Sequence, residues 1–211
     1  MKKVYLLFII LFCSAANNFA QDLNYGVWSQ VKTSFDLSKD LEGAVSGMYR
    51  QDLQTPGRRA YIGELAVKYD LAKKWSVEAE YRLKKVPSES TQRVAIAANF
   101  REGMGDFDLY FRTKLQHEFL QYAIPETAWR NRVKMRFDHF KKIKPYVSYE
   151  LFLNRNYKEI NLTTYRAATG VDYNINKHNG LEVYLIVDQE IYNVYPVTDL
   201  IFGVSYEYKF K

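Results

Sequence analysis

The segment Trp75-Ser76-Val77-Glu78-Ala79-Glu80-Tyr81-Arg82-Leu83-Lys84 switches between apolar and polar side chains at almost every step. Successive side chains of a β-strand point to opposite faces of a sheet, so this segment predicts a strand with one apolar and one charged face. The alternation recurs along the chain in about eleven candidate strands, most of them near the 9–11 residues that cross a bilayer at a tilt. These strands cover residues 23–37, 41–53, 61–71, 75–84, 94–100, 107–119, 129–137, 147–154, 165–174, 181–188 and 200–210.

The connections between these segments alternate in length. Short ones are expected at 39–40, 72–74, 103–106, 140–144 and 176–180, and longer ones at 54–59, 86–92, 121–127, 156–161 and 191–199. Short periplasmic turns and longer outer loops are typical of outer-membrane barrels. Inside hydrocarbon every backbone polar group must be paired, so strands cross only as a closed barrel. We therefore expect an all-β fold: a single antiparallel transmembrane β-barrel of about 10–12 strands with its apolar face outward. Antiparallel closure requires an even count, hence ten or twelve strands.

A soluble, lipocalin-like periplasmic barrel that binds lipid is the alternative, because it has the same alternation turned inside out. Two features favour the membrane. Aromatic residues near strand ends predict an interfacial girdle, for which we select Trp75, Phe119, Trp129, Phe137 and Tyr173. The aromatic last strand, with Tyr206, Tyr208 and Phe210, resembles the C-terminal signal of the barrel-insertion machinery, although Lys211 follows the Phe.

The N-terminus predicts a secretory signal peptide. Lys2 and Lys3 precede an apolar run from Val4 to Ala16, which is too short for a membrane-spanning helix. We expect cleavage after Ala20, which gives a signal peptide at 1–20 and one barrel domain at 21–211. Cys13, the only cysteine, lies in the removed segment, so no disulfide is expected. The 30 basic residues fall to 28 against 24 acidic ones. This mild, interleaved excess does not argue for nucleic acid.

The sharpest local feature is a basic stripe on one face of one strand, formed by Arg130, Arg132, Lys134 and Arg136. Four like charges repel unless acids lie beside them, and the neighbouring candidate strands offer Asp108, Glu118 and Glu150. One interpretation is an anion-attracting lumen. The other, which we favour, is an ion-paired network that fills a narrow barrel, because about eight strands already leave an interior filled by side chains.

Signals for catalysis are weak. His117, His139 and His178 are dispersed, so they predict neither a metal site nor a recognisable triad. No phosphate-binding loop or zinc motif is present, and we expect no cofactor. An enzyme acting on outer-membrane lipid or peptide at the barrel rim stays as an alternative, which replacement of the three histidines by Ala would test.

At Trp129-Arg130-Asn131-Arg132-Val133-Lys134 the chain resembles the domain-of-unknown-function family 2490 of secreted bacterial proteins. The resemblance extends to a Trp near the mature start, here Trp28, and to the aromatic last strand, and it covers about residues 21–211. It implies an outer-membrane-like barrel and transfers no activity. We therefore expect an integral outer-membrane barrel, either a narrow channel or a structural barrel. Its partners would be outer-membrane lipid and the insertion machinery, and an anion-selective pore is the first alternative.

Overall fold

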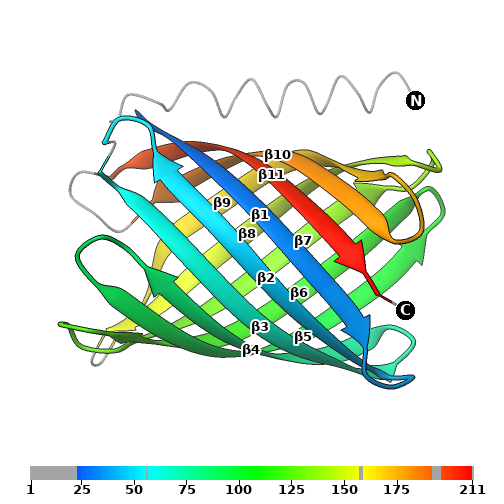
Figure 1. The fold of residues 1–211 in the computed structure, drawn as a ribbon, viewed down its shortest axis with the longest axis horizontal. Helices are drawn as coiled ribbons and strands as arrows, with labels where there is room; N and C mark the ends of the chain where they lie inside the picture. The colour runs from blue at the N-terminus through cyan, green and yellow to red at the C-terminus, as the bar shows by residue number, and fades with distance from the viewer. Residues whose placement is uncertain (1–22, 56, 157–158, 192–195, 211) are drawn as a thin grey trace.

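The computed structural model describes residues 23–55, 57–156, 159–191 and 196–210. The predicted signal peptide and Cys13 lie outside them. Eleven strands form one closed barrel in which each strand pairs with its sequence neighbours and β1 pairs with β11 (Figure 1). The strands are β1 (Leu23–Asp36), β2 (Leu41–Asp52), β3 (Arg59–Ala72), β4 (Trp75–Lys85), β5 (Ser90–Met104), β6 (Phe107–Leu120), β7 (Glu126–Phe137), β8 (Ile143–Asn156), β9 (Glu159–Asn174), β10 (Asn179–Glu190) and β11 (Thr198–Lys209).

The closing seam between β1 and β11 is parallel, with a register that runs from Leu23 opposite Thr198 to Ser34 opposite Lys209. Our expectation of an even number of strands is therefore wrong. A parallel ladder satisfies the two edge strands as an antiparallel one does, so the barrel closes with eleven strands. Both strands run in the same direction side by side in Figure 1. The start of β1 and the end of β11 consequently lie at opposite rims.

The two rims are unequal. The turn rim carries the connections 37–40, 73–74, 105–106, 138–142 and 175–178, and the loop rim carries 53–58, 86–89, 121–125 and 191–197. Gly105 begins a two-residue turn at φ 64°, in the left-handed region that favours glycine. The longer loop expected at 156–161 is largely absent, because β8 continues to Asn156 and β9 starts at Glu159. The difference in length between the rims is thus smaller than predicted.

The outer surface of the barrel is apolar. On every strand the alternate residues assigned to this face leave large side chains exposed, for example Val31, Val45, Leu65, Leu83, Ile96, Leu115, Val133, Tyr149, Val171, Leu185 and Phe202. Charged side chains are buried inside instead: Glu80, Lys114 and Glu150 are each 6–8% exposed. This confirms the predicted orientation and contradicts the lipocalin-like alternative, which requires an apolar lumen.

Candidate functional site

Three adjoining cavities lie along the length of the barrel, and the one at the turn rim also reaches outer-face residues such as Trp75. The central cavity has a volume of about 720 Å³. A loop-rim cavity of about 780 Å³ shares the lining residues Trp28, Arg50 and Arg166 with it. A turn-rim cavity of about 750 Å³ shares Lys68, Glu78, Arg112 and Arg132 with it. The lumen is therefore a series of chambers, and these shared residues form the junctions between them.

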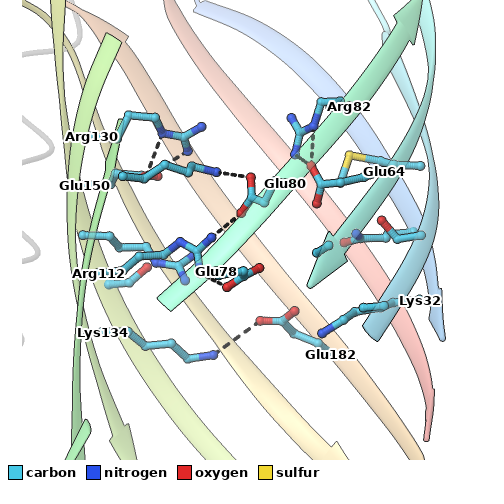
Figure 2. Close-up of a pocket in the computed structure, with 18 of the residues that line it drawn as sticks. Lys32, Glu64, Glu78, Glu80, Arg82, Arg112, Arg130, Lys134, Glu150 and Glu182 are labelled. Atoms are coloured by element: carbon cyan, nitrogen blue, oxygen red, sulfur yellow. Dashed lines mark hydrogen bonds and ion pairs between the residues drawn. The ribbon is translucent and has the colours of Figure 1, made fainter. Parts of the chain in front are cut away.

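One wall of the central cavity is a network of ion pairs (Figure 2). On its β4–β6 side, Arg112 binds Glu78 at 2.6 Å and also binds Glu80, which accepts a second bond from Lys114 at 2.9 Å. Residues two apart in a strand lie on the same face, so Glu78 and Glu80 both point inward from β4. There they contact the inward cations of β6, Arg112 and Lys114. The mixed signs leave this part of the wall closely neutralised.

Part of the wall on β8, β10 and β11 is apolar and aromatic. Tyr146, Tyr184, Ile186 and Ile201 form a buried cluster on β8, β10 and β11, against which Trp28 and Ala168 pack. The ring of Tyr184 lies on Gly203 and the ring of Tyr146 lies on Gly170, where a Cβ atom would collide with each ring. Because Gly203 and Gly170 have no side chain, the rings of Tyr184 and Tyr146 can pack directly against the backbone of the neighbouring strand. The cluster narrows the lumen from this side.

The predicted basic stripe of β7 lines this lumen and is mostly neutralised. Arg130 binds Glu150 at 2.8 Å and Arg136 binds Asp108 at 2.6 Å, and both acids are among the three candidates named from the sequence. Lys134 binds residues of more distant strands, Asp172 at 3.2 Å and Glu182 at 3.6 Å. These last partners could not be chosen from sequence, because the barrel curvature brings β7, β9 and β10 together.

Glu118 does not join the stripe, and our expectation for this residue is wrong. In the register of β6 with β7 it lies opposite Glu126, and it accepts a hydrogen bond from Thr91 at 3.1 Å. It is at the loop-rim end of β6, whereas Arg132, Lys134 and Arg136 pair with residues nearer the turn rim. The alternation of side chains correctly predicts that Glu118 lies on the inward face. Its position along β6 is too far from the cations of the stripe for it to pair with them.

Two lumen cations stand out because they have no carboxylate within ion-pair distance among the described residues. They are Arg50 and Arg132, whereas the other basic residues that line the central cavity each have such a partner. Arg132 lies opposite Glu150 in the strand register. Arg50 lies at the junction with the loop-rim cavity and Arg132 at the junction with the turn-rim cavity. Each junction thus carries a guanidinium without a direct ion pair to a described carboxylate, although Arg132 interacts electrostatically with Glu150.

The central cavity as a whole has a positive surplus. Its lining contains twelve basic and seven acidic side chains, which leaves a formal excess of five positive charges. Low-dielectric walls focus the field of such an excess along the lumen. Two of the twelve cations, Lys134 and Arg166, also pair with Asp172 and Asp188 from outside this lining, which compensates part of the excess.

The predicted girdle residues lie at both rims on the outer face. Phe119 and Trp129 are near the loop rim, and Trp75, Phe137 and Tyr173 are near the turn rim. Near the turn rim Trp75 packs against Phe100, with ring centroids 4.8 Å apart, and Phe137 against Phe107, at 5.0 Å. At the end of β11, the rings of Tyr208 and Phe210 meet edge to face at 4.6 Å, and Tyr206 donates to Asn179. Their roles as a girdle and an insertion signal stay predictions.

The histidines occupy separate places in the structure. His117 lies on the outer face of β6 and its Nδ1 is 2.9 Å from the hydroxyl of Thr127. His139 and His178 lie at the turn rim, where His139 is 3.5 Å from Asp106. Within the described ranges no group of three or more His, Cys, Asp or Glu side chains could hold a metal ion. No helix in that part of the chain has the length and apolar character to cross a bilayer.

Comparison with known families gives a match to one described as "Protein of unknown function (DUF2490)", over residues 25–192. The chain belongs to this family. Membership in DUF2490 confirms the resemblance seen in the sequence. A similar solved structure is described as "Outer-membrane expressed OmpT of Vibrio cholerae", with 10% identity and a TM-score of 0.42. The match covers 71% of this chain and 54% of that chain, so it spans about half the length of that protein. No curated protein matches the chain.

Sequence reasoning missed Arg50 and the aromatic wall. Arg50 was placed on the polar face of its strand but not singled out, and Trp28 was noted only for the family resemblance. The inward positions of β10 include Tyr184 and Ile186 between Glu182 and Asp188. This interruption of the polar face was the available signal that part of the lumen is apolar.

Proposed function

We propose that this DUF2490 protein is an integral outer-membrane β-barrel that forms a narrow channel. The observation that carries the membrane assignment is the exposed apolar surface on all eleven strands. A strand of 12 to 14 residues, with a rise of about 3.3 Å per residue and a tilt of about 40°, covers roughly 30–35 Å. That length matches the hydrocarbon core of a bilayer. The proposal places the turn rim and the end of β11 in the periplasm.

Cell fractionation tests the membrane location. We expect the protein in the detergent-extracted outer-membrane fraction, with gel migration that changes on heating because the closed barrel resists unfolding by detergent. Replacement of Phe210 by Ala should reduce its recovery there if the insertion machinery reads the aromatic end of the chain. Recovery of the unmodified protein as a soluble periplasmic monomer would contradict the proposal.

The three cavities in series support the channel. Trp28 occupies the junction of the loop-rim and central cavities, where the guanidinium carbons of Arg50 and Arg166 lie 3.8 and 5.3 Å from the centroid of its ring. Removing this ring should widen the passage. We therefore expect Trp28→Ala to raise single-channel conductance in planar bilayers at least twofold. Trp129→Ala on the outer face is the matched control and should leave conductance unchanged. Absence of current in both the unmodified protein and Trp28→Ala would reject a channel in favour of a purely structural barrel.

A preference for anions is the second proposal, supported by the surplus of positive charge around the central cavity and by the unpaired Arg132. Reversal potentials in a salt gradient measure this preference. Charge reversal by Arg132→Glu combined with Lys134→Glu should shift selectivity toward cations. Arg155→Glu is the control, because it makes the same charge reversal at an exposed residue on the outer face of β8. Equal selectivity in the double variant and the unmodified protein would reject anion selection by the stripe.

A further inference from the structure

The guanidinium of Arg50 lies in the lumen in a fixed orientation. Trp28 and Arg50 are directly opposite in the register of β1 with β2, and the guanidinium stacks on the indole with its carbon 3.8 Å from the ring centroid. Its Nε donates to the sulfur of Met48 at 3.0 Å. Neither of its Nη groups has a hydrogen-bond acceptor among the described residues. The fork of donors is therefore held in place but not satisfied by the protein.

The surroundings of Arg50 are rich in further guanidinium groups. Arg82, Arg93 and Arg166 all interact electrostatically with it. Arg82 and Arg93 share one acid, Glu64, at 2.5 and 3.7 Å. The Nη2 of Arg93 is buried and has no hydrogen-bond partner among the described residues. Burying cations without enough counter-charge is costly unless an anion accompanies them. At this end of the central cavity the four guanidinium groups outnumber the three carboxylates that pair with them directly, Glu64, Glu150 and Asp188.

The position of Arg50 is accessible along the lumen. It lines both the central cavity and the loop-rim cavity, together with Trp28 and Arg166. When a guanidinium stacks on an aromatic ring, its N–H groups still point outward in the plane of the guanidinium. Two of them can therefore bind two oxygens of one ligand. A spherical halide cannot use both donors in this way. The geometry thus favours an oxyanion over chloride.

We propose that Arg50, held on Trp28, is the binding site of a small oxyanion, a carboxylate or a phosphate, with Arg93 as a neighbouring donor. The site differs from the basic stripe of β7 and lies on another part of the barrel wall. It deepens the proposed anion preference by naming the class of solute, and its role in transport rests on that proposed function. Binding itself does not require conduction.

Isothermal titration of the full mature chain, folded in detergent micelles at low ionic strength, tests the site. The probes are inorganic phosphate, acetate and chloride. We expect phosphate, acetate or both to bind more tightly than chloride. The comparison of phosphate with acetate identifies which oxyanion the site prefers. Arg50→Gln should weaken the binding at least tenfold. The control is Arg58→Gln, a loop-rim cation whose side chain is 76% exposed, which should change the affinity by less than twofold.

Several outcomes overturn the proposal: no oxyanion binding by the unmodified protein, equal affinity for chloride, or equal losses in the two variants. Should Arg50→Gln fail to fold, Arg50→Lys keeps the charge but loses the fork, and about fivefold weaker binding is expected. Unchanged affinity in folded Arg50→Lys would also overturn the site. Micelle binding involves no current, so failure here leaves the conductance test standing, and binding without conductance contradicts the channel alone.

Discussion

The variant Glu150→Gln tests whether the ion pairs inside the barrel determine its stability. The side chain of Glu150 is 7% exposed and lies 2.8 Å from Arg130 and 3.9 Å from Arg166, whose side chains are 12% and 19% exposed. Removing one partner of a buried pair costs about 3–5 kcal/mol, because it leaves an uncompensated charge. The amide oxygen of Gln can still accept from the Nε of Arg130, which returns about 1 kcal/mol. We expect a loss of roughly 2–4 kcal/mol in the free energy of unfolding.

Glu207→Gln is the matched control, because Glu207 also lines the central cavity and pairs with Lys32 at 3.0 Å. That pair is 39% and 30% exposed, so solvent screening reduces its value to at most about 1 kcal/mol. Equilibrium urea unfolding in lipid vesicles, followed by tryptophan fluorescence, measures both variants. Moderate salt should narrow the difference only slightly, because buried pairs are weakly screened. A loss below 1 kcal/mol for Glu150→Gln, or equal losses for the two variants, refutes a stabilising network.

Two further pairs of variants test the packing and the faces of the barrel. Gly203→Ala should cost about 1–3 kcal/mol, because its Cβ would collide with the ring of Tyr184, whereas Gly63→Ala meets open space and should be nearly neutral in the same urea assay. Leu65→Lys on the outer face should cost about 2–4 kcal/mol and lower outer-membrane recovery, whereas Ser46→Lys in the central cavity should be tolerated. Equal tolerance of Lys at both positions would contradict the assignment of faces.

The sequence was sufficient for the faces and most strand positions, because these depend on a local period of two. Trp75–Lys85 is a strand whose Glu78, Glu80 and Arg82 point inward, as the alternation predicts. The register between strands was not accessible in the same way. Parity selects Glu118 as readily as Asp108 for the stripe, and only the pairing of β6 with β7 separates them. Partners three strands away, such as Glu182 for Lys134, depend on the curvature of the closed barrel.

The parallel pairing of β1 with β11 explains why the aromatic row around Trp28 could not be predicted from the sequence. Pairing of β1 with β11 places Trp28 opposite Gly203, which lies opposite Tyr184, then Gly170 and Tyr146 on the following strands. Large rings and glycines thus alternate around the wall at one level, and each glycine provides room for a neighbouring ring. The row continues across the seam only if β1 and β11 close directly on one another. An additional strand between them would separate Trp28 from this row. The odd strand count is therefore part of what positions Trp28, and through Trp28 it positions Arg50 at the junction of the two cavities.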